Sequence, residues 1–485
     1  MGGQWPRGGP GSVMAAPGIS LGKLATLGWI GVIAVALWLA YGLPYLGYDA
    51  LFSVVWGADL LGPRPLVFDA PGYPTPHPLA NLVTALLAPL RDGAALALEL
   101  ITLVAFAVLG WTTFLLGRRL FSTGVGVVAG LVIVTRPPLV KLVLLGSIDI
   151  AFLALVIGAA AAEAAQRRRG APVLALLFLA GLLRPEGWLL SAAYVLYLAR
   201  PAGSRRRLAL AAAAAAAPLV WLLFDLAVTG DLLHSFHGAR EFTERDELAA
   251  SVGSVVVAVP KNLAGILGMW VLAGSALGVG LALWRARGRA ALPIAVAAVG
   301  SAAFLALGLG GMPLYSRFLL VPAAALVVFF GVAALAWRLW PGEERPRAAW
   351  APVLAAVLLL VVSLPADAER LSFLRARAAK VRDVQSDLQR LAAYPAFRAR
   401  QVACPPLQID NRRGWPLLAH SLETAPSSIV AAEPTAAPRG GLVVRLSRPD
   451  PQRDSARDRE QAPPQGSRPV YANASWTVYG RCVGR

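Results

Sequence analysis

The sequence predicts a mainly α-helical, polytopic membrane protein with a small α/β domain at its C-terminal end. Hydrophobic residues make up 57% of the 485-residue chain and charged residues only 15%, and the mean hydropathy is +0.61. These values exceed those of soluble globular chains. A net charge of +18 would suggest nucleic acid in a soluble protein. Here much of the arginine lies in short loops between apolar runs, so we interpret the charge as a topology signal.

The N-terminal segment, residues 1–23, is predicted to be disordered and cytoplasmic. Its Arg7 and Lys23 precede an apolar run that is too long for a signal-peptide core, and no small-residue cleavage site follows. We therefore expect the first apolar run to be retained as a membrane span.

Basic clusters set the predicted orientation, because cytoplasmic loops collect Lys and Arg. Placing all of these clusters inside gives about eleven crossings in a transmembrane domain of residues 24–365. The clusters lie at residues 118–119, 167–169, 200 with 205–207, 285–289 and 338–347. The expected spans are 24–46, 94–116, 124–135, 147–165, a broken pair in 171–199, 208–228, 263–284, 291–308, 318–337 and 351–364.

Two apolar segments need separate treatment. Residues 77–90 are too short to cross comfortably, so the loop 47–93 is expected to hold two helices that lie on the outer surface. Residues 171–199 are long enough for one span, but basic clusters flank them and Arg184-Pro185 interrupts them. Two short membrane helices that meet near the outer surface fit this pattern better.

The C-terminal segment, residues 366–485, is charged and proline-containing, and is predicted to be an extracytoplasmic α/β domain. It opens with an amphipathic helical stretch and continues through short β-like runs, "SSIVAAE", "GLVVRLS" and "ASWTVYG". Residues 448–469 are predicted to be a disordered loop. The two cysteines, Cys404 and Cys482, both lie here, and a disulfide between them fits an oxidising compartment. Two unpaired buried thiols are the alternative.

With this orientation, ionisable residues gather near the outer ends of the spans. A charge in hydrocarbon costs at least about 2.5 kcal/mol, so such residues usually face a wet cavity or a protein interior. A carboxylate at a span end can also simply reach the headgroups, and Arg184 can pair with Glu186. The group consists of Asp49, Glu99, Asp149, Arg184, Glu186, Asp225 and Arg317.

The second outer loop, residues 229–262, contains His234, His237 and Arg240. Two histidines at i and i+3 can bind a metal, but no third ligand follows at metal-site spacing. Substrate contact or ordinary loop polarity explains them better. Arg136 and Lys141 lie outside, against the positive-inside trend, and are candidates for holding a phosphate.

An outer carboxylate, several arginines and a lipid-accessible cavity suit sugar transfer from a lipid-linked donor. The carboxylate would take the proton of an acceptor hydroxyl, and guanidinium groups would stabilise the departing lipid phosphate. Asp49, directly after the first span, is placed where an aqueous acceptor and a membrane-held donor meet.

At these residues the chain resembles the GT-C superfamily of integral-membrane glycosyltransferases, which use polyprenyl-phosphate sugars. The similarity lies in the order of "GYDALFSVVWGADLL", "PLVFDAPGYPTPHPL", "GSIDIAFLAL", "GLLRPEGWLL", "VTGDLLHSFHGAR" and "YSRFLLVPAAALVVFFG", and covers most of residues 24–340. It implies Asp49 as the catalytic base and Arg184 and Arg317 as contacts of the donor. Asp149, Glu186, His234, His237 and Arg240 are the further substrate-binding candidates.

The resemblance implies a hexosyl- or pentosyltransferase of the inverting type in the plasma membrane, with a polyprenyl-phosphate-sugar donor and an envelope glycan or glycolipid acceptor. Many members carry paired acids at the first position, whereas Tyr48 precedes Asp49 here and no D-x-D motif follows. No metal site is therefore assigned, although a divalent metal stays open. The cysteine-containing tail looks like the outer domain of some actinobacterial members.

Two other functions stay open. A transporter or flippase of lipid-linked precursors would also use a charged cavity, but with charges near the bilayer midplane and often an internal repeat. A non-catalytic envelope assembly protein would need no acid at Asp49.

Overall fold

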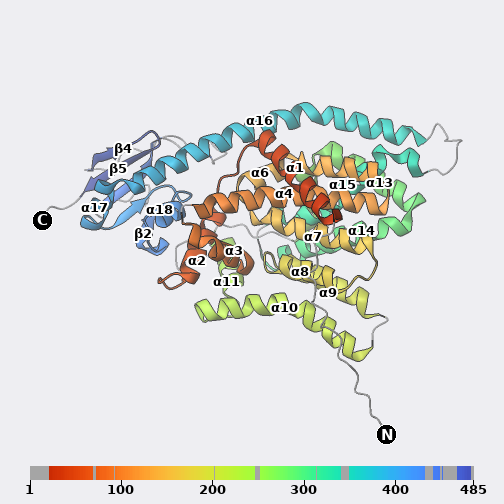
Figure 1. Ribbon diagram of the computed structural model, residues 1–485, viewed down its shortest axis with the longest axis horizontal. Coiled ribbons are helices and arrows are strands. Elements are labelled where there is room, and N and C mark those ends of the chain that lie inside the picture. The colour runs from red at the N-terminus through yellow and green to blue at the C-terminus, as the bar shows by residue number, and fades with distance from the viewer. Residues whose placement is uncertain are drawn as a thin grey trace, which may run out of the picture.

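The computed structural model describes residues 21–68, 73–91, 93–200, 203–245, 252–312, 314–339, 349–431, 441–447, 450–451 and 467–481. A helical bundle makes up most of the molecule, and a small domain built on a mixed sheet lies at one end (Figure 1). The predicted disordered segment 1–23 lies almost wholly outside the described residues.

Long apolar helices form the bundle, so the chain is a multi-pass membrane protein. Among the described residues, seven helices are long and apolar enough to cross a membrane. They are α1 (Leu21–Tyr41), α4 (Gly93–Leu120), α7 (Ile148–Ala165), α10 (Ser204–Thr229), α14 (Arg287–Leu309), α15 (Leu320–Ala334) with the 3-10 turn η2 (Ser316–Leu319), and α16 (Ala351–Ala393).

Two bent helix pairs raise the number of spans to nine if each pair counts once. Helices α5 (Thr123–Val134) and α6 (Pro137–Leu144) meet at 58°, and α12 (Val252–Leu267) and α13 (Met269–Arg285) at 109°. The predicted number of eleven crossings also counts the two helices on either side of Arg184-Pro185, which are α8 (Ala171–Gly181) and α9 (Glu186–Ala199). These helices fold back on each other, since the Gly170 amide at the start of α8 donates to the Tyr194 hydroxyl in α9 at 3.1 Å.

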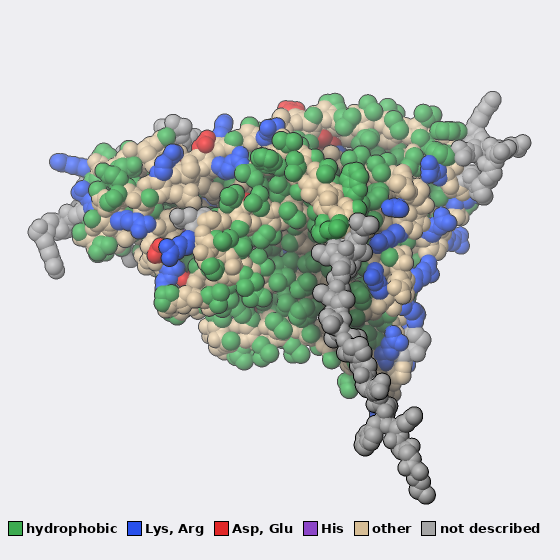
Figure 2. Space-filling model, viewed as in Figure 1, with side chains coloured by type: hydrophobic (Ala, Val, Ile, Leu, Met, Phe, Trp, Pro, Cys, Tyr) green, Lys and Arg blue, Asp and Glu red, His purple; other side chains and the backbone are tan. Residues whose placement is uncertain are grey.

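Basic loops that are distant in sequence lie together at one end of the bundle. Arg167 donates to the carbonyl of Gly288 at 3.2 Å, and Arg119 donates to the carbonyl of Ala161 at 2.6 Å. Lys and Arg side chains gather along the edge that lies opposite the sheet domain (Figure 2). The basic clusters therefore share one side, as the positive-inside pattern requires.

Shorter helices cover the other end of the bundle. These are α2 (Tyr48–Leu61), α3 (Pro78–Leu87) with η1 (Ala88–Leu90), and α11 (His234–Arg245), while η3 (Ala336–Leu339) follows α15. Helices α2 and α3 match the two predicted surface helices. They touch closely, because the Thr84 hydroxyl in α3 donates to the Ser53 carbonyl in α2 at 2.6 Å.

Helix α16 links the bundle to the sheet domain without a break. Its 43 residues span about 65 Å at 1.5 Å per residue, and it runs along one long edge of the molecule (Figure 1). The domain boundary that the sequence predicts at residue 365 falls inside this helix, at Pro365. The connection is therefore a continuous helix and not a loop.

The sheet domain has the strand order β2-β1-β3-β5-β4. Strand β1 pairs in parallel with β2 and β3, and β5 pairs antiparallel with β3 and β4. Its elements are α17 (Pro395–Ala403), β1 (Leu407–Ile409), α18 (Trp415–Ser421), η5 (Pro426–Ser428), β2 (Ile429–Ala431), β3 (Gly441–Leu446), β4 (Arg468–Ala472) and β5 (Trp476–Arg481).

The three β-like runs that the sequence predicts are β2, β3 and β5, whereas β1 and β4 were not predicted. Strand β4 begins at Arg468, inside the segment 448–469 that was predicted to be disordered, and most of that segment lies outside the described residues. Cys404 is disulfide-bonded, while Cys482 lies outside the described residues, so its pairing stays a prediction.

Two large hydrophobic cores organise the described residues, and a small third cluster joins α9 to α10. The larger lies within the helical bundle. The second joins α2, through Phe52 and Trp56, to the sheet domain, through Leu418 and Trp476. The predicted surface helix α2 is therefore buried on one face against the C-terminal domain.

Candidate functional site

A cavity of about 1870 Å³ opens where the bundle, α2 and the sheet domain meet. Its walls come from α2, the loop before α3, α6, the start of α7, the α8–α9 break, α10, α11, α12, α14, η2, α16 and the loop after β1. The predicted site residues that line it are Asp49, Asp149, Arg184, Glu186, His234 and Arg317. The structure thus brings together side chains that lie up to 268 positions apart in the sequence.

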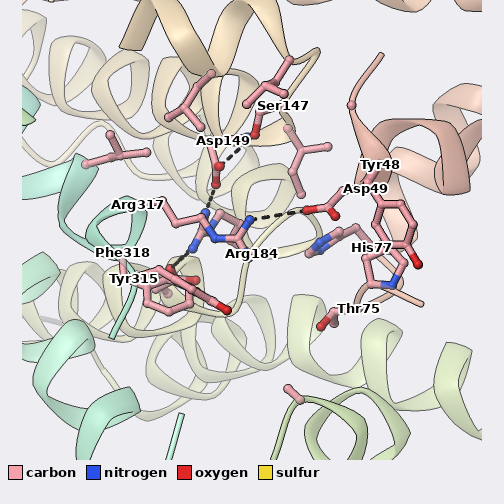
Figure 3. Close-up of a pocket in the computed structure, with 18 of the residues that line it drawn as sticks. Tyr48, Asp49, Thr75, His77, Ser147, Asp149, Arg184, Tyr315, Arg317 and Phe318 are labelled. Atoms are coloured by element: carbon pink, nitrogen blue, oxygen red, sulfur yellow. Dashed lines mark hydrogen bonds and ion pairs between the residues drawn. The ribbon is translucent and has the colours of Figure 1, made fainter. Parts of the chain in front are cut away.

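Asp49 lies in the first turn of α2, at the mouth of this arrangement. The preceding turn is fixed to the end of α6, since the Gly47 amide donates to the Leu145 carbonyl at 2.9 Å. A Cβ at Gly47 would approach that same carbonyl oxygen to 3.0 Å, so glycine allows the close approach. The Asp49 side chain is 50% exposed, and its Oδ2 lies 3.4 Å from Nη1 of Arg317 (Figure 3). It is therefore both accessible and oriented.

Arg184 lies deeper in the cavity, between two carboxylates. It pairs with Asp149, and its Nη2 lies 2.7 Å from Oε1 of Glu186. The Ser147 hydroxyl donates to Oδ2 of Asp149 at 2.8 Å (Figure 3). The Arg184 guanidinium also lies 4.9 Å from the ring centre of Phe318. With only 6% of its side chain exposed, Arg184 chiefly holds the α7, α8–α9 and η2 segments together.

The wall formed by α10 and α11 is aromatic and acidic. The His234 Nε2 lies 2.8 Å from the Tyr73 hydroxyl, and the two rings stack with centres 5.8 Å apart. Asp225, which is 1% exposed, accepts hydrogen bonds from the amide (3.0 Å) and the hydroxyl (2.9 Å) of Ser235. These bonds fix the turn between the helices and thereby place His234 in the cavity.

His77, which the sequence analysis did not single out, also lines the cavity. Its Nδ1 is buried and has no hydrogen-bond partner in the described part of the chain. Burial, together with the nearby positive charges of Arg184 and Arg317, lowers the pKa of His77 to about 3. The imidazole is therefore neutral at physiological pH. In the sequence, the prolines of "PTPHP" around His77 were the available signal, because proline restricts the backbone and so fixes the position of the histidine.

Two predicted substrate contacts do not reach the cavity. His237 pairs with Asp231 at 2.7 Å, and Arg240 pairs with Glu244 at 2.9 Å, both at exposed positions on or before α11. The structure supports loop polarity for these two residues, which was the alternative explanation.

Three further predictions about charges have mixed outcomes. Glu99 is half-buried in α4 and does not line the cavity. Arg136 is 2% exposed, pairs with Asp367 of α16 at 2.9 Å and donates to the Leu267 carbonyl, so it holds helices together and is not available to a phosphate. Lys141 does line the cavity.

Basic side chains from the part of α16 that follows Pro365 and from the sheet domain also reach the cavity. The sequence analysis did not predict this group, which consists of Arg370, Arg377, Arg412 and Arg413. Arg370 and Arg377 are seven positions apart and therefore share one face of α16. Only the packing of the sheet domain against α2 reveals that they face the same cavity as Asp49.

No group of three or more His, Cys, Asp or Glu side chains that could hold a metal ion occurs within the described ranges. The arrangement that is present combines an exposed carboxylate, an adjacent guanidinium and a neutral imidazole in a space large enough for two substrates. Such a set can accept a proton from a hydroxyl and stabilise negative charge that develops on a leaving group.

Comparisons with known proteins show similarity in fold. No family model matches the sequence, and no curated protein matches it. The structure of ArnT from Cupriavidus metallidurans bound to undecaprenyl phosphate superposes with a TM-score of 0.55 at 14% identity, over 96% of this chain and 99% of that one.

The Archaeoglobus fulgidus oligosaccharyltransferase in the apo form superposes with a TM-score of 0.50 at 12% identity. This match covers 86% of the present chain but only 65% of the oligosaccharyltransferase, so the chain spans less than two thirds of that enzyme. At these identities the similarity concerns the fold alone.

Proposed function

We propose that this chain, which has the fold of the GT-C membrane glycosyltransferases, transfers a sugar from a polyprenyl-phosphate-linked donor to a cell-envelope acceptor. The reaction takes place at the outer face of the plasma membrane. The observation that carries the proposal is the half-exposed carboxylate of Asp49, held 3.4 Å from Arg317 in a cavity between membrane helices and a water-exposed domain.

In the proposed reaction, Asp49 takes the proton of the acceptor hydroxyl while the hydroxyl oxygen attacks the anomeric carbon of the donor sugar. The new carbon–oxygen bond forms while the bond from the anomeric carbon to the phosphate oxygen breaks. The electron pair stays on the departing polyprenyl phosphate, and the Arg317 guanidinium stabilises its charge. Attack from the face opposite the phosphate inverts the configuration of the anomeric carbon.

Two features support a lipid-linked donor. Arg317 lies in η2 at the start of an apolar span, where a lipid phosphate meets the edge of the hydrocarbon. The similar ArnT structure holds undecaprenyl phosphate, and this chain covers 99% of its length. The present cavity is lined by apolar side chains, such as Leu142, Leu145 and Ile266, as well as by charged ones.

Asp49→Asn tests the proposal, because the amide keeps the shape of the side chain but cannot accept the proton. The purified variant, supplied with polyprenyl-phosphate sugars and envelope acceptors, should release polyprenyl phosphate at least about 100-fold more slowly than the wild type. Thermal stability should change little, because the side chain is half exposed.

Asp231→Asn is the matched control. It makes the same substitution at an exposed acid that does not line the cavity, so it should keep full activity. Full activity of the Asp49→Asn variant would rule out Asp49 as the base, and with it the proposed chemistry. Transport of the lipid-linked sugar with unchanged rate in that variant would favour a flippase.

A further inference from the structure

The charges that line the cavity are unevenly distributed. The cluster around Asp49 carries no excess of positive charge. Its three carboxylates, Asp49, Asp149 and Glu186, face two guanidinium groups, Arg184 and Arg317. On the α10–α11 wall the charged lining residues are Asp225 and Glu241. Arg317 is assigned to the donor phosphate in the proposed function, and Arg184 is held between Asp149 and Glu186. Neither place therefore offers a further cation to a second anionic ligand.

The opposite wall is basic. Its charged lining residues, within the described part of the chain, are Lys141 of α6, Lys261 of α12, Arg370 and Arg377 of α16, and Arg412 and Arg413 of the sheet domain. Helix α6 packs against both α12 and α16, so these elements form one continuous surface. Within this group, Arg413 also pairs with Asp450 at 2.9 Å. We call Lys141, Lys261, Arg370, Arg377, Arg412 and Arg413 the basic wall.

Two of these residues flank an exposed aromatic ring on α16. Arg370, Phe373 and Arg377 follow each other at helical spacing and all line the cavity. Phe373 is 60% exposed, and the Arg377 guanidinium lies 5.8 Å from its ring centre. A flat apolar ring between two cations suits a sugar ring that carries an anionic group.

A residue of the sheet domain, Arg412, places the basic wall next to the proposed base, Asp49. The Nε of Arg412 donates to the Tyr48 hydroxyl at 3.2 Å, and its guanidinium lies 4.9 Å over the Tyr48 ring. Tyr48 is the neighbour of Asp49 in the first turn of α2. A ligand on the basic wall is therefore next to the carboxylate that would deprotonate it.

The position of the wall along α16 separates it from the site proposed for the donor. Arg370 and Arg377 follow Pro365 by five and twelve residues, or about 8 and 18 Å along the helix, in the direction of the sheet domain. Arg317, in contrast, opens an apolar span. A lipid phosphate stays at the edge of the hydrocarbon, whereas the basic wall extends beyond it.

From these observations we infer that the basic wall is the acceptor subsite, and that the acceptor carries a phosphate or carboxylate close to the hydroxyl that receives the sugar. This inference rests on the proposed function, because it names the second substrate of the same cavity. It gives the C-terminal domain a direct part in substrate binding.

Binding of small probes tests the inference without any need for turnover. Methyl glucoside, methyl glucuronide and methyl glucoside 6-phosphate differ in one group and can be titrated into the full-length protein in nanodiscs, followed by the fluorescence of Trp188 and Trp221 in the cavity. The wild type should bind the two anionic probes about tenfold more tightly than the neutral one. The preference should shrink as the salt concentration rises.

Arg370→Gln, Arg377→Gln and their combination should reduce this preference, and the double variant should remove it. Lys380→Gln is the matched control, because Lys380 is exposed on the same helix and does not line the cavity. Binding of undecaprenyl phosphate, measured in the same nanodiscs, should stay within twofold of the wild type in all of these variants.

Equal binding of neutral and anionic probes by the wild type would overturn the inference, as would an unchanged preference in the double variant. Loss of undecaprenyl phosphate binding in the double variant would assign the basic wall to the donor instead. The Asp49→Asn variant should retain the preference for anionic over neutral probes, because it leaves the residues of the basic wall in place. Its catalytic result therefore tests the proposed function separately from this subsite.

Discussion

Asp49 and Arg184 are both charged residues of the cavity, but their exposures differ. Half of the Asp49 side chain is exposed, and one partner lies at 3.4 Å, so a substrate can reach it. Arg184 is 6% exposed and lies between two carboxylates and two aromatic rings. The family resemblance implies a donor contact for Arg184, which stays a prediction, and its burial between two carboxylates gives it a structural role as well.

Replacing Arg184 should therefore lower stability more than it lowers donor affinity. Arg184→Met leaves Asp149 and Glu186 buried without their cation, which costs about 3–5 kcal/mol and should lower the Tm measured by thermal unfolding. The triple variant that also carries Asp149→Asn and Glu186→Gln should regain stability, since no carboxylate is then left unpaired. A triple variant as unstable as the single one would contradict this explanation.

His77 should make the stability of the protein depend on pH. Its pKa is about 3 in the folded protein, against an ordinary value of 6.5. Between these values the unfolded chain binds more protons than the folded one, so the free energy of unfolding rises with pH. The Tm should fall as pH decreases from about 6.5 towards 3, and His77→Gln should weaken this dependence. Identical pH profiles of the variant and the wild type would exclude this role of His77.

The sequence revealed some of these residues and concealed others for a physical reason. Asp49, Asp149, Arg184 and Arg317 stand out because a charge beside an apolar run is costly without a partner or water. His77 and Arg370 lie in polar segments where such residues are ordinary, so only tertiary packing shows where they point. His237 and Arg240 belong to the same polar type and lie outside the cavity.

At the scale of elements, α2 fixes the position of Asp49. Its glycine at residue 57 allows close contact with α3, since a Cβ there would meet the Thr84 hydroxyl and approach the Ala85 amide nitrogen to 2.6 Å. On its other side, the Gln385 side chain of α16 donates to the Leu46 carbonyl at 2.7 Å, just before α2. Helix α2 is therefore held from two directions.

Gly57→Ala should push α2 away from α3 and move Asp49. Overpacking of this kind costs about 1–3 kcal/mol, so both the Tm and the transfer rate should fall. Gly31→Ala in α1 is the matched control, because a Cβ there would meet nothing within 4 Å, and it should leave both unchanged or slightly raise the Tm. If the two substitutions had equal effects, close packing at residue 57 would not be the cause.

The long apolar helices could be predicted from sequence because their signal extends over about 20 residues. Helix α16 could not be delimited, since its composition changes at Pro365 although the helix continues. Strands β1 and β4 were missed because of their surroundings: β1 directly follows Pro405-Pro406, and β4 begins inside the charged, proline-rich segment 448–469.

At the scale of the whole molecule, the second hydrophobic core unites the cavity with the sheet domain. Its residues come from α2 and from the C-terminal elements, so the domain packs on the helix that carries Asp49. The sequence predicted both parts, but not their common core, because nothing in the sequence pattern states which apolar faces meet.

The predicted disulfide can be tested through this core. Cys404 is 5% exposed within it, and a bridge to Cys482 would close a loop worth about 4 kcal/mol on the chain-entropy model. Cys404→Ser, Cys482→Ser and the double variant should lower the Tm by equal amounts, since each removes the same bond. Additive losses in the double variant would show that the two cysteines act independently.

The shared core also limits how the two parts can be recombined. A chimaera that joins this bundle to the terminal domain of a distant homologue would bring a foreign surface against Phe52 and Trp56 of α2. Unless that surface were complementary, the helix would tilt, and the graft would lose turnover even though every membrane helix was intact. Natural exchange of the terminal domain therefore requires that α2 be inherited with it.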